Sequence, residues 1–248
     1  MISNLIQPTS TAIRPDPLPQ RVLAIMPHPD DAEYYCGGAL AWWAEQAVEV
    51  FIAIVTDGGK GSRDPAMTTA RLIEIRQREQ QAAALHLGAR EVIFLGFPDG
   101  ELLPTLEVRR ELTRLIRRVR PDTVICPDPE VRFYGHSLNH PDHRATGEAT
   151  LAVLKAATGN HLYYPEFQAE GLEPHRVQWL YLAGPAQPNV EVDVTATLAA
   201  KIAALGEHCS QFTNAEEYVA RETSLIEAQP LADGSTRWVE KFQRFILE

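Results

Sequence analysis

Apolar and polar positions alternate in blocks along the first 155 residues, and the blocks are of two kinds. One kind is a short apolar run rich in Val, Ile and Phe and bounded by Pro, Gly or Asp, which is typical of a strand buried on both faces. Such runs predict strands at residues 22–26, 48–56, 91–97 and 123–126. The other kind repeats apolar residues three and four apart and predicts amphipathic helices at about 35–47 and 108–119.

This alternation favours an α/β fold with a mostly parallel sheet and helices on both sides, a Rossmann-like three-layer α/β/α sandwich. Further strands are predicted at 177–183 and 190–194, and helices at about 196–209 and 214–228 form a C-terminal helical elaboration. The polar, proline-punctuated residues 1–20 predict an N-terminal arm. No repeat and no shift in composition divides the remainder, so residues 21–248 are expected to form one α/β domain.

Polar or turn residues follow each of the first four predicted strands. They occupy positions 28–31, 57–59, 98–100 and 127–143. Because the carboxyl ends of parallel strands share one edge of a sheet, and ligands bind in the crevice there, we expect these four stretches to meet in space.

Composition narrows the class of protein. The chain has 248 residues and a net charge of −10, and the basic residues between Arg109 and Arg120 alternate with apolar ones as on the wet face of a helix. Nucleic acid and membrane are therefore not expected as partners. Three cysteines without a CxxC pair, no signal-peptide pattern and no membrane-length apolar run predict a cytoplasmic protein.

Two short motifs carry the candidate chemistry. In HPDD, His28 and Asp31 stand three residues apart where a strand turns into a helix, and imidazole with carboxylate suits Zn²⁺, Fe²⁺ or Co²⁺. Alone, HPDD is equally well explained as a helix cap. HPDH places His140, Asp142 and His143 in the same arrangement on the same predicted edge. Together they predict a catalytic metal site of two histidines and a carboxylate, without deciding between His140 and His143.

Two other features have a structural and a functional interpretation. Glu79 interrupts the apolar stripe of a predicted helix, with Arg76 three residues before it, so the two form a buried pair or Arg76 holds a polar substrate. Asp99 is a turn residue before Gly100 or a member of the crevice. The glycine-rich TDGGKGSRDP lacks GxGxxG and GK[ST] spacing, which favours a lid or substrate loop over a nucleotide site.

With these motifs, and with VTDGGKGS, FPDGEL, RPDTVICPDP and the HCSQ segment, the chain resembles the LmbE/PIG-L-like family of zinc-dependent N-acetylglucosaminyl deacetylases over residues 21–212. The resemblance implies that zinc is bound by His28, Asp31 and His143. It implies that Asp30 is the general base, that His140 supports the transition state and that Asp142 orients His140 and favours its charged form. Arg76 and Asp99 match the family's sugar-contacting positions.

The implied reaction removes an acetyl group from an N-acetylglucosamine-like amino sugar by means of a zinc-activated water, with one zinc per chain and the base or His140 protonating the amine. Family members are often trimers or hexamers, so a homo-oligomer is expected. The family's tyrosine before HPDH is replaced by Leu138 and Asn139, with Tyr134 as the candidate substitute. The roles of Glu33 and His208 stay open.

Three alternatives remain from the residues themselves. The same site suits a zinc-dependent amidase acting on another N-acyl or thiol-conjugate substrate. A phosphoesterase on this fold would need more carboxylate ligands and a second metal ~4 Å away. The remotest alternative is a non-catalytic, metal-containing Rossmann-like binding module, but Asp30 and His140 exceed what a three-ligand metal site requires.

Overall fold

The computed structural model describes residues 18–247 except 213, 215 and 217–225. Within these residues an eight-stranded sheet has the order β3-β2-β1-β4-β7-β10-β8, with β9 paired to β10. The parallel strands are β1 (Arg21–Met26), β2 (Glu49–Thr56), β3 (Glu91–Phe97), β4 (Thr123–Pro127) and β7 (Trp179–Ala183). The strands β8 (Val190–Asp193), β9 (Glu227–Pro230) and β10 (Thr236–Ile246) form antiparallel pairs.

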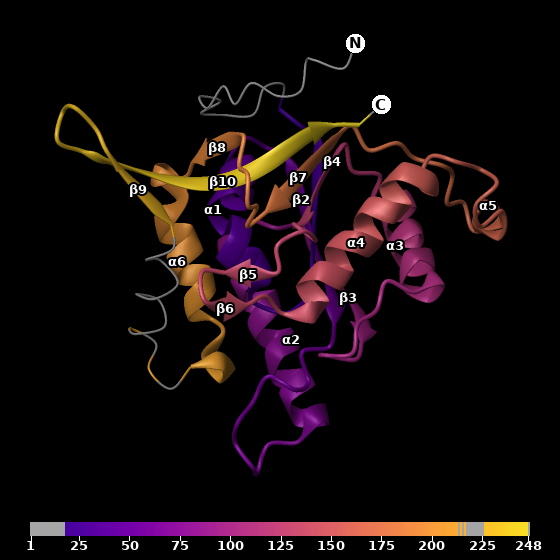
Figure 1. Ribbon diagram of the computed structural model, residues 1–248, viewed down its shortest axis with the longest axis horizontal. Helices are drawn as coiled ribbons and strands as arrows, with labels where there is room; N and C mark the ends of the chain where they lie inside the picture. Colours follow the sequence, from indigo (N-terminus) through magenta and orange to yellow (C-terminus); the bar gives the residue numbers. More distant parts are fainter. Residues whose placement is uncertain (1–17, 213, 215, 217–225, 248) are drawn as a thin grey trace.

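Helices cover both faces of the sheet (Figure 1). One face carries α1 (Asp31–Glu45), α2 (Thr69–His86) and α6 (Leu198–Gly206), and the other carries α3 (Leu106–Val119) and α4 (Pro141–Ala156). The alternation of β1 explains both cores: its residues 22, 24 and 26 face α1, whereas 23 and 25 face α3 and α4. The prediction of a mostly parallel sheet flanked by helices is confirmed. None of the described helices combines the length and apolarity that crossing a membrane requires.

Shorter elements connect these layers. They are β5 (Phe133–Tyr134), β6 (Ser137–Leu138), α5 (Glu166–Ala169), η1 (Thr195–Thr197) and η2 (Cys209–Gln211). The strands β5 and β6 form a small antiparallel hairpin of their own, which lies in front of α1 and the sheet in Figure 1.

Three details differ from the sequence predictions. The strand β3 is half-exposed rather than buried on both faces, because it is the end strand of the sheet. Arg117 is buried rather than on the wet face of α3, and its guanidinium donates to the carbonyl oxygens of Ala157, Asn160 and Tyr163. The predicted helix at 214–228 lies mostly outside the described residues, and its last two positions belong to β9.

The strand β10 was not predicted, and it follows the helices expected at 196–209 and 214–228, the first of which is present as α6. It inserts between β7 and β8, and Figure 1 shows it as the long yellow strand across the sheet. Its period-two pattern is interrupted by Glu240, which is charged and yet 5% exposed. A buried carboxylate inside a strand hides the strand from a hydrophobic pattern.

Glu240 is buried because it holds a break in α1. Cys36 leaves the helical conformation at φ −145°, and beyond it the N–H groups of Gly38 and Ala39 donate to the Glu240 carboxylate at 3.0 and 2.8 Å. Lys201 of α6 donates to Glu240 at 2.5 Å and to the carbonyl oxygen of Tyr34 at 2.7 Å. The carboxylate therefore caps the second half of α1, and the ammonium caps the first half.

This cluster generates a stability prediction. Glu240→Leu leaves the Lys201 charge buried without its partner and leaves two backbone N–H groups without acceptors, so the free energy of unfolding should fall by about 3–5 kcal/mol. Urea denaturation measures it. The matched control is Glu227→Leu in the same hairpin, because Glu227 pairs with Lys241 near the surface, where ion pairs contribute about 0–1 kcal/mol. Equal losses in both variants would contradict the role of Glu240.

Candidate active site

The HPDD motif forms the turn between β1 and α1, and Asp30 has an unusual backbone there. Its φ is 104°, a left-handed conformation that costs a residue with a side chain about 1–3 kcal/mol. The carbonyl oxygen of Asp30 still accepts from the Tyr34 N–H at 2.9 Å, so the helix starts immediately after it. The turn separates the two adjacent carboxylates: Asp31 contacts histidines, whereas Asp30 contacts Arg76.

The structure brings His28, Asp31 and His143 together. The Asp31 carboxylate lies 3.1 Å from His28 Nδ1 through Oδ2 and 3.3 Å from His143 Nε2 through Oδ1. One donor atom from each of the three lies within 4.8 Å of the others, and all three side chains are buried. Burial alone would raise the pKa of Asp31, but His143 and His28 hold that pKa well below its usual range. Two imidazoles and a carboxylate on one point fit a divalent cation such as Zn²⁺.

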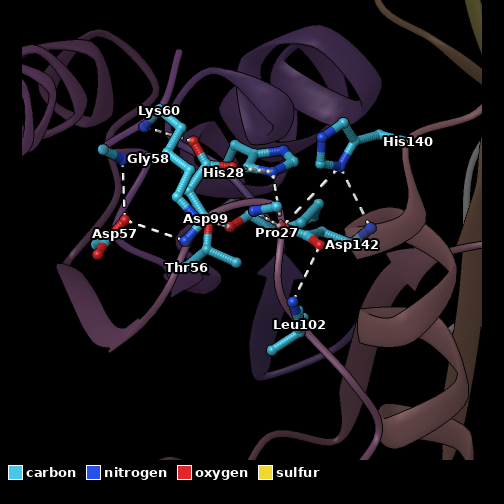
Figure 2. Close-up of polar contacts among 12 residues, drawn as sticks. Pro27, His28, Thr56, Asp57, Gly58, Lys60, Asp99, Leu102, His140 and Asp142 are labelled. Carbon is cyan, nitrogen blue, oxygen red and sulfur yellow. Dashed lines mark hydrogen bonds and ion pairs between the residues drawn. The ribbon is translucent and has the colours of Figure 1, made fainter. Parts of the chain in front are cut away.

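A second group of possible ligands shares His28. Its carboxylates determine which nitrogen of the His28 ring carries the proton. His28 Nε2 lies 3.2 Å from Asp99 Oδ1 and 3.3 Å from Asp142 Oδ2, and Figure 2 shows the ring beside both carboxylates. Because ionised carboxylates only accept hydrogen bonds, they hold the proton on Nε2 and leave the Nδ1 lone pair for a cation. Asp99 and Asp142 are thus placed to orient His28 for a cation at Nδ1.

Asp142 contacts His140 through its backbone and not through its carboxylate, as the expected pairing would require. The Asp142 carboxylate is fully buried and accepts from the N–H groups of Gly100 (2.7 Å) and Leu102 (3.2 Å), and its closest approach to His140 Nδ1 is 4.0 Å. Instead, the backbone N–H of Asp142 donates to His140 Nδ1 at 3.3 Å (Figure 2). Burial and the charge of nearby His28 lower the pKa of His140. The Asp142 charge acts in the opposite direction, as the sequence predicts, but it does not outweigh burial and His28 in this geometry.

Arg76 neither pairs with Glu79 nor extends into open space. It is buried, and its guanidinium donates to the carbonyl oxygens of Pro29 (2.5 Å) and Gly58 (3.1 Å) and to Asp30 Oδ2 (3.3 Å). Burial raises the pKa of Asp30 to about 6, against the opposing effect of the Arg76 charge. The contact of Arg76 with a sugar stays a prediction, but its contacts with the HPDD turn are direct.

Asp99 links the glycine-rich loop to the site. Its Oδ2 accepts from the Lys60 N–H at 3.0 Å, while its own N–H donates to Asp57 at 3.2 Å (Figure 2). The loop packs so closely that a Cβ on Gly61 would lie 2.6 Å from Arg76 Nη1. Gly58 and Gly61 of TDGGKGS therefore allow close packing around Arg76. A sugar contact by Asp99 stays a prediction.

A cavity of about 500 Å³ opens beside these groups. It is lined by Asp30, Asp31, Tyr34, Tyr35, Tyr134, Ser137, Leu138, Asn139, His140, His143 and Gln211. Tyr134, the candidate substitute for the family's tyrosine, reaches it from the β5–β6 hairpin, and its hydroxyl lies 3.3 Å from that of Tyr35.

Sequence reasoning missed Tyr35 as a member of the site. Its hydroxyl lies 3.1 Å from His143 Nδ1, the ring nitrogen on the side away from Asp31, so it fixes the second imidazole much as the carboxylates fix the first. The available signal was its place four residues after Asp31, on the same face of a helix. In the helix predicted at about 35–47, Tyr35 counts only as the first of the apolar positions.

Comparison with known proteins places the chain in a family. The model of the PIG-L family, described as GlcNAc-PI de-N-acetylase, matches residues 23–154. The chain belongs to this family. It is 33% identical to the diacetylchitobiose deacetylase of Thermococcus kodakarensis over 193 residues, 78% of this chain and 70% of that protein. It is 29% identical to a probable N-acetyl-alpha-D-glucosaminyl L-malate deacetylase 2 of Bacillus anthracis, over 91% of this chain and 92% of that protein.

A solved structure agrees with this placement in the family. The N,N'-diacetylchitobiose deacetylase of Pyrococcus horikoshii, in complex with its inhibitor MPG, matches with a TM-score of 0.81 and 29% identity. The match covers 92% of this chain and 84% of that chain. Together with the deacetylase relatives, it supports an enzyme that hydrolyses an amide, built around a group of histidine and aspartate side chains able to hold a metal ion.

The geometry around His28 generates a prediction on metal affinity. Asp31→Ala should abolish tight binding of Zn²⁺, because it removes a ligand, whereas Asp142→Asn should weaken it about 10–100-fold by loosening His28. Competition with a chromophoric chelator measures both affinities. Glu79→Gln is the control, since Glu79 touches none of the three ligands and instead accepts from the N–H and the hydroxyl of Ser210. An Asp142→Asn affinity equal to that of the control would exclude the orienting role.

Proposed function

We propose that this chain removes the acetyl group from the acetamido group of an N-acetylglucosamine-like sugar or conjugate, with zinc as the cofactor. The observation that carries the proposal is a second carboxylate, Asp30, held beside the His28–Asp31–His143 group and lining the same cavity. A metal site without a proton-transfer role would not need it. The relatives named for acetylated glucosamine compounds support the sugar class.

The three donor side chains would hold the zinc, which when bound would polarise the acetyl carbonyl and lower the pKa of a water molecule. Asp30 would take the proton from that water. Its raised pKa of about 6 suits a base that is ionised at neutral pH and still accepts a proton readily. Arg76 keeps the carboxylate in place from behind by binding both Pro29 and Asp30.

His140 would stabilise the oxyanion from the other side of the cavity as a neutral donor. Because its Nδ1 accepts from the Asp142 N–H, the neutral ring carries its proton on Nε2. That N–H can donate to a developing oxyanion without a positive charge on the ring. Asp30, protonated in the first step, would then return its proton to the departing amine.

The proposal is tested by Asp30→Asn. The variant keeps the three donors and the shape of the turn but has no base, so kcat should fall about 10²–10⁴-fold while zinc content stays at one per chain. Release of free amine from N-acetylglucosaminides, including N,N'-diacetylchitobiose, measures turnover. Near-normal kcat in Asp30→Asn would refute the role of Asp30.

The same assay tests the substrate class. Wild-type protein reconstituted with zinc should release amine from at least one N-acetylglucosaminide and from none of a matched set of N-acetylated amino acids. Inactivity on every sugar, with turnover of a non-sugar amide or a thiol conjugate, would replace the sugar deacetylase with the broader amidase.

A further inference from the structure

Three buried polar side chains behind the cavity are not used by the proposed chemistry. Gln80 of α2, Glu33 of α1 and His208, just before η2, are each 0% exposed. These three side chains form a network of contacts that ends at the backbone N–H of Asp30. Burying an amide, a carboxylate and an imidazole together costs free energy unless each is paired, so their arrangement calls for a physical reason.

Each hydrogen bond of this network fixes the orientation of the next side chain. Glu33 Oε1 accepts from Gln80 Nε2 at 2.7 Å, and Gln80 Oε1 accepts from the Asp30 N–H at 3.0 Å. Because an ionised carboxylate cannot donate, Glu33 forces the NH₂ of Gln80 toward itself and the amide oxygen toward Asp30. Without Glu33, the Gln80 amide could rotate and turn its NH₂ group toward the Asp30 N–H, which is itself a donor.

His208 lies against the other oxygen of the Glu33 carboxylate. Its Nε2 lies 3.3 Å from Glu33 Oε2. Burial alone would lower the pKa of His208, but the nearby Glu33 carboxylate raises it above the ordinary value. The pair thus holds opposite charges where either charge alone would be costly.

The network ends at Asp30, the residue with the strained backbone. Asp30 keeps a φ of 104°, and α2 binds it from both sides: Gln80 accepts its N–H, and Arg76, one helical turn earlier, binds the preceding carbonyl oxygen and the carboxylate. A left-handed conformation at a residue other than glycine persists only where its surroundings hold it.

We propose that Gln80, oriented by the buried Glu33–His208 ion pair, is a positioning residue that holds the Asp30 backbone in the conformation that aims its carboxylate at the reacting water. This inference rests on the proposed role of Asp30 as the base. The competing explanation is structural: the three side chains would merely join α1, α2 and the segment around η2.

The chain offers a matched control for that explanation. One residue before Gln80, Glu79 accepts from the N–H and hydroxyl of Ser210 at 2.7 and 2.6 Å. This contact joins the same helix to the same segment, but it does not reach Asp30. Ser210→Ala therefore loosens the junction and leaves the Asp30 N–H bonded to Gln80.

The central variant is Gln80→Met, which keeps the volume of the side chain and removes both hydrogen bonds. We expect kcat to fall about 10–100-fold, because small misplacement of a catalytic group has effects of that size, with KM within about threefold of wild type. Zinc content should not change. Ser210→Ala should retain wild-type kcat and KM. A kcat for Gln80→Met no lower than that of Ser210→Ala would overturn the proposal.

A rescue variant separates orientation from packing. Glu33→Gln with Gln80→Glu exchanges the two side chains, so the new amide at 33 donates to the new carboxylate at 80, and that carboxylate still accepts from Asp30. We expect its kcat to be at least fivefold above that of Gln80→Met. If Gln80→Met does not fold, the exchanged variant is compared with Glu33→Gln alone, which leaves the Gln80 amide free to rotate. No advantage of the exchange in either comparison would count against the proposal.

Hydrogen exchange gives a readout independent of turnover. The Asp30 amide should be protected in wild-type and Ser210→Ala protein and should exchange at least tenfold faster in Gln80→Met. Loss of protection in a protein without deacetylase activity in any form would sink the proposed function and leave the contact standing. Full activity with unchanged protection in Gln80→Met would sink the positioning role and leave the proposed function intact.

Discussion

The left-handed turn at Asp30 is the constraint on which the site depends. It lets two consecutive carboxylates face different partners, one toward the imidazoles of His28 and His143 and the other toward Arg76. The strain is offset by hydrogen bonds from α2, so a helix far along the chain holds the geometry of a four-residue motif.

Both imidazoles proposed as ligands are oriented by their far nitrogens. Carboxylates hold His28 through Nε2, and the Tyr35 hydroxyl contacts His143 through Nδ1, so each ring presents one nitrogen to Asp31. His140 is oriented by a backbone N–H instead, which leaves it neutral and accessible at the cavity. The second contact of each ring thus separates the two proposed roles of histidine, as a ligand and as a hydrogen-bond donor.

The sequence predicted most of this arrangement because parallel strands bring their carboxyl ends together. HPDD, Asp99 and HPDH could be assigned to one edge from the alternation of strands and helices alone. Tyr35, Gln80 and Glu240 could not, since each acts through a contact between helices or strands distant in sequence, and a single chain carries no pattern for such pairs. Arg76 was singled out only as a neighbour of Glu79, which interrupts the apolar stripe. Two of its actual partners are the carbonyl oxygens of Pro29 and Gly58, and backbone atoms leave no signature in a sequence.

The hydrogen bonds between the break in α1 and Glu240 have a consequence for how the protein folds during synthesis. Gly38 and its acceptor Glu240 are 202 positions apart, so the helix that carries Asp31 has no cap at its break until β10 has entered the sheet. A ribosome delivers β1 and both carboxylates of HPDD about 200 residues before Glu240. The nascent chain therefore passes through a long interval in which the donor groups for a cation exist but are not yet held in place. The contact that caps the break in α1 therefore forms only after Glu240 has been synthesised.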